Sequence, residues 1–252
     1  MSDSIVIIPT YNEKENIESI IRAVFALEKD FDILVIDDAS PDGTGAIVRR
    51  LMDEFPDRLF IEERKGKLGL GTAYIHGFKW ALERSYEYIF EMDADFSHNP
   101  NDLPRLYETC AVEGYDVAIG SRYCTGVNVV NWPMGRVLMS YFASKYVQFV
   151  TRMNIKDTTA GFVCYRRKVL ETIDLDKIKF KGYAFQIEMK YTAYALRFKI
   201  KEVSIIFINR RLGVSKMNSD IFGEAFFGVI DLRWRKIRGK IKPKSVIEKS
   251  QK

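Results

Sequence analysis

The chain of 252 residues has few of the side chains that form disulfides or bind transition metals: three cysteines and two histidines. Cys110, Cys124 and Cys164 are odd in number and lack the spacing of a zinc site, so we expect free thiols in a reducing compartment. An isolated histidine beside a turn is more often structural than catalytic, and His98 is therefore not our candidate for a general base.

The sequence also lacks a long apolar run. The longest stretch without Asp, Glu, Lys or Arg spans residues 123–135, and it is too short and too rich in Gly, Asn and Pro to cross a bilayer. No basic segment followed by a hydrophobic segment precedes the first expected strand, so we expect no signal peptide. These absences predict a cytoplasmic protein that does not cross a membrane.

Composition is otherwise ordinary, with 47% hydrophobic and 29% charged residues, which allows a sizeable core in one large α/β domain. The net charge of +5 is unevenly distributed, because residues 233–244 contain seven Lys or Arg and no acid. Such a run indicates a solvated tail, a nucleic-acid patch or a membrane-surface anchor. No nucleic-acid recognition motif accompanies it, so we expect no nucleic-acid partner.

Apolar, β-branched runs alternate with stretches of helical periodicity. In the stretch after the first run, Ile17, Ile20, Ile21 and Val24 recur at helical spacing. We expect strands near residues 4–8, 33–36, 59–62, 88–92 and 117–120, and helices between them, one at 44–54. The alternation predicts an α/β fold with a mostly parallel central sheet flanked by helices. Ligands of such sheets bind beyond the carboxyl ends of the strands.

Polar clusters follow several of these runs. Residues 10–13 follow the first strand, Asp37 and Asp38 the second, and Asp93 and Asp95 a later one. An Asp-x-Asp motif arises often by chance, and a solvated turn is the alternative. Two carboxylates at a strand end can also hold Mg²⁺ or Mn²⁺ against a diphosphate, since these ions prefer oxygen ligands. Their position among the other clusters favours a metal–diphosphate site.

Two further loops leave alternatives open. Asp37 and Asp38 could cap the helix expected at 44–54, but Ser40 could cap it equally well, which would leave the acids as acceptors for a base or ribose. Residues 66–72 are glycine-rich, but Thr72 stands where a P-loop needs lysine. They form either a flexible turn or, with the neighbouring cations Arg64, Lys65 and Lys67, a loop that faces phosphate.

The second half offers candidate cationic and amphipathic features. Arg122, Arg136 and Arg210 are either surface residues or a guanidinium cluster for a second phosphate. Residues 134–150 and 221–234 have amphipathic helical patterns. Either helix could pack on the domain, and the second, which runs into the basic segment, could instead lie in a membrane interface.

Several motifs occur together in one order: Pro9-Thr10-Tyr11-Asn12-Glu13, Asp37-Asp38-Ala39-Ser40-Pro41-Asp42-Gly43-Thr44, Lys67-Leu68-Gly69-Leu70-Gly71, Asp93-Ala94-Asp95-Phe96-Ser97-His98, Gly120-Ser121-Arg122-Tyr123 and Arg210-x-x-Gly213-x-Ser215-Lys216. With them the chain resembles family 2 glycosyltransferases of the GT-A fold, in particular polyprenol-phosphate (dolichol-phosphate) mannose synthases. The resemblance covers about residues 4–216. It implies a catalytic domain over residues 1–216, and we expect an amphipathic, possible membrane-interfacial helix over 217–238 and a basic tail over 239–252.

The resemblance implies inverting, metal-dependent transfer of mannose from GDP-mannose to polyprenyl phosphate, with Mg²⁺ or Mn²⁺ as cofactor. UDP-glucose or UDP-N-acetylglucosamine as donor, or a non-catalytic nucleotide-binding module, are the alternatives. The resemblance also implies catalytic roles for Asp93, Asp95 and Arg122, with Asp93 and Asp95 as metal ligands. The nucleotide-sugar set is Pro9, Tyr11, Glu13, Asp37, Asp38, Lys67, Gly69, Asp93, Ala94, Asp95, Gln186 and Glu188. The acceptor-phosphate set is Arg122, Arg136, Ser140, Arg210 and Lys216.

The chemistry of transfer to a lipid phosphate is consistent with a site made of carboxylates and arginines. A sugar hydroxyl acceptor needs a general base, whereas a lipid phosphate is already an anion near neutral pH. Such an acceptor needs positive charge that brings two anionic substrates together and orients the attacking oxygen. We therefore expect no dedicated base. We also expect peripheral association with the cytoplasmic face of a membrane, through the chain's own helices or through a partner membrane protein.

Overall fold

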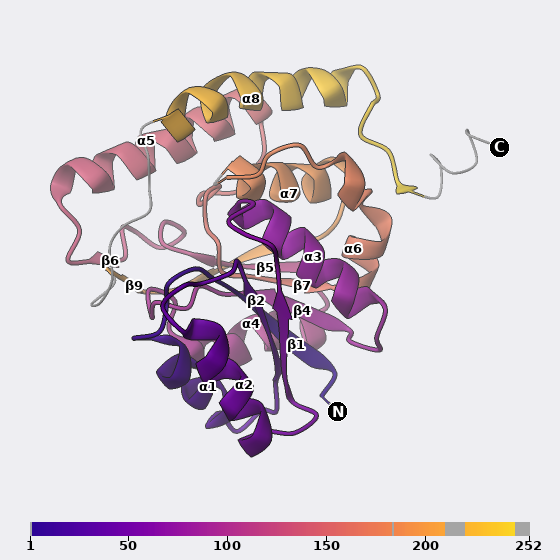
Figure 1. The fold of residues 1–252 in the computed structure, drawn as a ribbon. Coiled ribbons are helices and arrows are strands. Elements are labelled where there is room, and N and C mark those ends of the chain that lie inside the picture. The colour runs from indigo at the N-terminus through magenta and orange to yellow at the C-terminus, as the bar shows by residue number, and fades with distance from the viewer. Residues whose placement is uncertain (1, 183, 210–219, 245–252) are drawn as a thin grey trace.

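A computed structural model describes residues 2–182, 184–209 and 220–244 (Figure 1). Its main sheet has seven strands in the order β3-β2-β1-β4-β7-β5-β8. All neighbours in it are parallel except β7, which is antiparallel to both β4 and β5. The predicted mostly parallel α/β sheet is therefore confirmed. The strands are β1 Ser4–Thr10, β2 Asp32–Asp37, β3 Leu59–Glu63, β4 Tyr88–Glu91, β5 Val117–Ser121, β7 Val163–Arg166 and β8 Ile200–Ser204.

Helices cover both faces of this sheet because its central strands are apolar on both sides. Ile5 and Ile7 of β1 belong to one buried cluster, and Val6 and Ile8 belong to the other, as the alternation of side chains along a strand requires. The first cluster lies under α3, α6 and α7, and the second under α1, α2 and α4 (Figure 1). These helices are α1 Ile17–Phe25, α2 Thr44–Glu54, α3 Leu70–Leu82, α4 Leu103–Ala111, α6 Arg167–Thr172 and α7 Ala184–Ala195, with 3₁₀ turns at Pro100–Asp102 and Leu175–Lys177.

Local predictions for the first half are confirmed except at one helix start. The four periodic apolar residues of α1 are all buried, and α2 has the predicted bounds. Capping of α2 by Asp37, Asp38 or Ser40, which the sequence left open, is not seen. Asp42 lies closer to the first turn and accepts hydrogen bonds from both the N–H and the hydroxyl of Thr44, at 3.0 and 2.6 Å.

The two amphipathic patterns of the second half form α5 (Met134–Thr151) and α8 (Asp220–Ile237), which lie next to each other (Figure 1). The ring of Tyr146 stacks on that of Phe226 at 4.6 Å. Residues 184–193 of α7 are buried on all sides, because α7 lies between the sheet and α8. A small second sheet pairs β6 (Val129–Val130) with β9 (Phe207–Ile208) near the start of α5.

Within the described ranges, every helix is too short or too polar to span a bilayer. The predicted boundary between residues 216 and 217 lies outside the described residues, and so does the tail beyond residue 244. The three cysteines are free thiols, two of them buried.

Candidate active site

The polar clusters meet at the carboxyl edge of the sheet, beside a cavity of about 540 Å³. Asp93 and Asp95 follow β4, and Arg122 follows β5, so each reaches the cavity from the end of a strand. The cavity continues from these charges to apolar side chains of α5 and α8, among them Phe142, Tyr146, Val147, Phe226 and Val229. One opening in the molecule thus has a charged end and an apolar end.

The Asp93-Ala94-Asp95 segment presents its two carboxylates differently. The Asp93 side chain is 39% exposed, whereas Asp95 is 6% exposed and accepts hydrogen bonds from the N–H and hydroxyl of Ser97. In the described part of the chain, no cluster of three or more His, Cys, Asp or Glu could hold a metal without help. Two carboxylates in the wall of a cavity nevertheless fit Mg²⁺ or Mn²⁺, which commonly take their remaining ligands from water and substrate phosphates.

His98 supports this segment structurally. Its Nδ1 accepts the N–H of Asp93 at 3.2 Å, and its ring stacks on Phe162 at 4.9 Å. Burial lowers the pKa of His98 to about 4, so the imidazole is neutral near pH 7. A neutral imidazole used as an acceptor for a backbone N–H agrees with our exclusion of His98 as the base.

A buried polar chain begins at Glu91, the last residue of β4 and two residues before Asp93. Gln186 donates from Nε2 to Glu91 at 2.7 Å, and Lys190 donates to the Gln186 carbonyl and side-chain oxygens at 3.2 and 3.3 Å. Burial raises the pKa of Glu91 and lowers that of Lys190. Gln186 lines the cavity, but both ends of its amide are held by these internal bonds.

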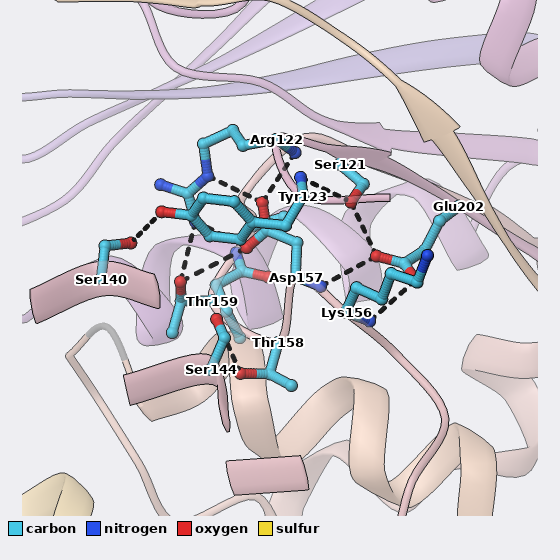
Figure 2. A network of polar contacts seen from close by, with 12 residues as sticks. Ser121, Arg122, Tyr123, Ser140, Ser144, Lys156, Asp157, Thr158, Thr159 and Glu202 are labelled. Carbon is cyan, nitrogen blue, oxygen red and sulfur yellow. Dashed lines mark hydrogen bonds and ion pairs between the residues drawn. The ribbon is translucent and has the colours of Figure 1, made fainter. Parts of the chain in front are cut away.

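Arg122 is the most tightly held cation of the site (Figure 2). Its Nε and Nη2 donate to the two carboxylate oxygens of Asp157 at 2.7 and 2.6 Å, and its backbone N–H donates to the same carboxylate at 2.9 Å. Nη2 also donates to Thr159 at 2.8 Å. Burial alone would raise the pKa of Asp157, but the Arg122 charge and these hydrogen bonds lower it below its usual value. The pair is therefore charged on both sides.

Glu202 of β8 anchors the peptide that carries Asp157 (Figure 2). Its carboxylate accepts the N–H groups of Lys156 and Asp157, both at 2.8 Å, and the Ser121 hydroxyl at 2.7 Å. Sequence reasoning missed both Asp157 and Glu202. The only local signal was the polar run at residues 156–159 ahead of the apolar strand β7.

The other predicted acceptor residues are only partly described. Arg136 lies 4.1 Å above the Trp132 ring and donates to Asn209 at 3.0 Å, and it lines the cavity with Arg122. Ser140 accepts the Tyr123 hydroxyl at 2.8 Å. Arg210 and Lys216 lie outside the described residues, so the structure does not test them.

The predicted nucleoside set lies at the ends of β1 and β2. Asp37 accepts hydrogen bonds from Thr10 and from the N–H and hydroxyl of Ser40. The Asp38 carboxylate accepts hydrogen bonds from Arg64 Nε at 2.6 Å and from the N–H of Leu68 at 3.3 Å. These bonds fasten the glycine-rich loop to the end of β2. Tyr11 faces Lys67, whose Nζ lies 5.2 Å from the ring centre, and Pro9 and Glu13 flank Tyr11 in the sequence. The nucleotide roles of these residues stay predictions.

The structure explains the glycines of this loop. A Cβ at Gly69 would lie 2.9 Å from the Lys181 carbonyl, and one at Gly71 would lie 2.8 Å from the Phe180 carbonyl. Glu188, predicted to belong to the donor-sugar wall, is fully buried and does not line this cavity, and its donor-sugar role stays a prediction. Its carboxylate accepts two backbone N–H groups and Arg235 of α8.

The fold and these paired acids and arginines define the class of protein. A model described as Glycosyl transferase family 2 matches residues 5–174, and the chain belongs to this family of glycosyltransferases. Its fold is GT-A. The chain is 47% identical over 238 residues to the polyprenol monophosphomannose synthase of Mycolicibacterium smegmatis, covering 94% of this chain and 88% of that protein. It is 44% identical over 241 residues to the undecaprenyl-phosphate mannosyltransferase of Micrococcus luteus, covering 94% and 98%.

Solved structures share the fold at lower identity. The glucosyl-3-phosphoglycerate synthase of Mycobacterium tuberculosis, in complex with Mn²⁺, uridine diphosphate and glucosyl-3-phosphoglycerate, has a TM-score of 0.64 at 18% identity, over 92% of this chain and 79% of that one. A mannosyltransferase of Pyrobaculum calidifontis, in complex with GDP-Man and Mn²⁺, has a TM-score of 0.58 at 17% identity, over 93% and 64%. At these identities the likeness concerns the fold alone.

Proposed function

We propose that this glycosyltransferase moves mannose from GDP-mannose to a polyprenyl phosphate, with inversion at the anomeric carbon and with help from a divalent cation. Two relatives of more than 40% identity carry the names of a polyprenol monophosphomannose synthase and an undecaprenyl-phosphate mannosyltransferase. GDP-Man and Mn²⁺ accompany one neighbour of similar fold. Both support the proposal without deciding donor or metal.

The observation that carries the proposal is the two-ended cavity. Asp93, Asp95 and Arg122 line one end, and the aromatic and aliphatic side chains between α5 and α8 line the other. A polyprenyl phosphate has the same division, with a charged head on an apolar chain. A saccharide acceptor would leave the apolar end without a partner, and apolar surface of that kind favours an apolar ligand.

The donor is expected on the β1 and β2 side of the acids. Asp93 and Asp95 would hold the cation against the donor diphosphate, because their carboxylates reach the cavity wall and are hard oxygen ligands. When bound there, a divalent cation offsets the negative charge that develops on the departing nucleotide diphosphate. Asp38 and Arg64 keep the glycine-rich loop at the end of β2, beside Tyr11.

The acceptor phosphate is expected beside Arg122 and Arg136. Asp157 holds the Arg122 guanidinium in one orientation before any substrate arrives, so the N–H groups of the guanidinium need little rearrangement to bind a phosphate. The phosphate oxygen attacks the anomeric carbon on the face opposite the leaving group and gives up no proton in that step. Arginines orient the nucleophile, and a general base is unnecessary.

Membrane association is proposed to be peripheral, on the cytoplasmic face. Phe142 and Phe149 of α5 and Phe227 and Trp234 of α8 are exposed by 62, 84, 73 and 52%. Exposed aromatic residues on helices that flank the apolar end of the cavity suit a lipid surface. A partner membrane protein covering the same helices is the alternative, and vesicle sedimentation separates the two, because only intrinsic affinity sediments the purified chain.

A donor competition tests the reaction. The purified protein is incubated with Mn²⁺, a short-chain polyprenyl phosphate and GDP-mannose, UDP-glucose or UDP-N-acetylglucosamine in turn, and sugar extracted into organic solvent is counted. We expect product from GDP-mannose, and about a hundredfold less with Asp95→Asn, which keeps an acceptor for Ser97 but loses the charge. Product from a UDP-sugar alone, or full activity of Asp95→Asn, contradicts the proposal.

A further inference from the structure

Glu188 lies at the centre of a contact between α8 and the segment that supports the glycine-rich loop. Its side chain is fully buried, and one carboxylate oxygen accepts the N–H groups of Lys179 and Phe180 at 2.8 and 3.0 Å. The other oxygen accepts Nη1 of Arg235 at 2.5 Å. A single carboxylate therefore fastens both α8 and residues 178–181, here called the strap, to α7.

The strap in turn touches the glycine-rich loop. The Lys181 carbonyl accepts the N–H of Gly71 at 2.8 Å. The Phe180 and Lys181 carbonyls approach Gly71 and Gly69 so closely that a Cβ at either position would meet them within 3 Å. The strap therefore supports the Gly69–Gly71 side of the loop, while Asp38 and Arg64 hold the loop to the end of β2.

A second contact joins the strap to α8 without Glu188. The Phe180 ring packs against Gly228 of α8, where an added Cβ would lie 2.3 Å from Phe180 Cζ. Glycine inside a helix costs about 1 kcal/mol relative to alanine. Its presence at this point is explained by the ring, since a larger residue would push the strap and α8 apart.

Arg235 and Arg238, both in the basic run, have different surroundings. Its side chain is 14% exposed and bound to Glu188, whereas Arg238 is exposed and lies near the Trp234 ring. An arginine bound to a buried carboxylate on α7 is not available as a membrane-surface charge. Arg235 therefore serves a different purpose from Arg238 and the lysines after it.

We propose that Glu188 and Arg235 are positioning residues that set the glycine-rich loop through the strap, so that the seating of α8 controls the loop. The use of that loop for the nucleotide sugar rests on the proposed function. The same helix also forms part of the apolar end of the cavity, through Phe226 and Val229. The link therefore joins the wall expected to receive the lipid to the loop expected to receive the nucleotide.

Hydrogen exchange tests the link without any substrate. In Arg235→Met we expect amides 66–71 to exchange about fivefold faster or more, a size typical of coupling between packed elements. Arg235→Lys should restore most of the protection. Arg238→Met removes one charge from the same region and should leave the exchange of these amides unchanged.

Arg235→Met also leaves a buried carboxylate unpaired, so a folding defect must be separated from the link. The double variant Glu188→Gln/Arg235→Met keeps an acceptor for the two strap N–H groups and removes the buried charge. It should unfold near the wild-type denaturant midpoint and still exchange faster at residues 66–71. Gly228→Ala should also speed the exchange of residues 66–71, because its Cβ would push Phe180 and the strap. Gly135→Ala is the control, because a Cβ at Gly135 meets open space. Wild-type exchange in both the folded double variant and Gly228→Ala overturns the proposal.

Titration of GDP-mannose with Mn²⁺ then separates this proposal from the proposed function. We expect about fivefold weaker binding in the double variant and unchanged binding in Arg238→Met. Faster exchange with no change in GDP-mannose binding upholds the link and contradicts the nucleotide role of the loop. Unchanged exchange together with normal binding overturns the link and leaves the proposed function standing.

Discussion

Arg122 and Arg235 form ion pairs of the same kind in two regions of the molecule. Their side chains are 9 and 14% exposed, and their partners Asp157 and Glu188 are fully buried. Each carboxylate also accepts backbone N–H groups. The difference is that Arg122 lines the cavity, whereas Arg235 binds behind its wall. Burial and pairing alone do not identify a substrate-binding arginine; the surface that its guanidinium faces does.

The largest effect is expected from removing the carboxylate of the cavity pair. Asp157→Ala leaves Arg122 buried without its main partner, which should lower the free energy of unfolding by about 3–5 kcal/mol. The folded fraction should also transfer poorly, because the guanidinium loses its orientation. Urea denaturation and transfer rates measured on the same samples check both.

Glu188→Ala is the matched variant for the pair behind the wall. It should lose comparable stability, but its folded fraction should show a smaller rise in the apparent KM for polyprenyl phosphate than the folded fraction of Asp157→Ala, because Glu188 does not line the cavity. If both variants raise that KM equally, the distinction between the two pairs is wrong.

Arg122→Lys should have a smaller effect, and it distinguishes the charge of Arg122 from the shape of its guanidinium. Arg122→Lys keeps the positive charge but loses the planar fork that meets Asp157 and a phosphate together. We expect the apparent KM for polyprenyl phosphate to rise about tenfold, or about 1.4 kcal/mol, and more than the KM for GDP-mannose. Arg235→Lys serves as control and should leave the acceptor KM unchanged. An equal rise for donor and acceptor would falsify the acceptor-phosphate role of Arg122.

The smallest effect on transfer is expected from the exposed charges. Removing residues 239–252 deletes five lysines and one glutamate but keeps both ion pairs and all of α8. Transfer to a short-chain acceptor should stay within about twofold, while cosedimentation with anionic vesicles should weaken, since each surface lysine contributes about 1 kcal/mol to such binding. Unchanged sedimentation would rule out the tail as an anchor.

Local patterns were enough to predict most of the sheet and the position of its paired acids. Continuous apolar runs identified β1 and β2, and the helical spacing of Ile17, Ile20, Ile21 and Val24 identified α1. Asp93 and Asp95 were recognisable because they follow β4 directly. Such features depend on neighbours in the sequence, and so a single sequence reveals them.

Long-range pairs could not be predicted in the same way. Asp157 follows Arg122 by 35 residues, and Glu188 precedes Arg235 by 47, so neither partner can be found from spacing. The motif that suggested a donor-sugar role for Glu188 places it on α7 but not on a particular face of that helix. Gln186, two residues away, reaches the cavity wall.

The reversed direction of β7 has a practical consequence for redesign. Because β7 runs against β4 and β5, its first residue lies at the edge where its neighbours end, and the segment before it brings Asp157 to that edge. A loop-grafting scheme that exchanges only the segments after each strand would leave this one untouched. Chimaeras meant to alter acceptor choice should therefore exchange residues 152–162 together with the segment after β5.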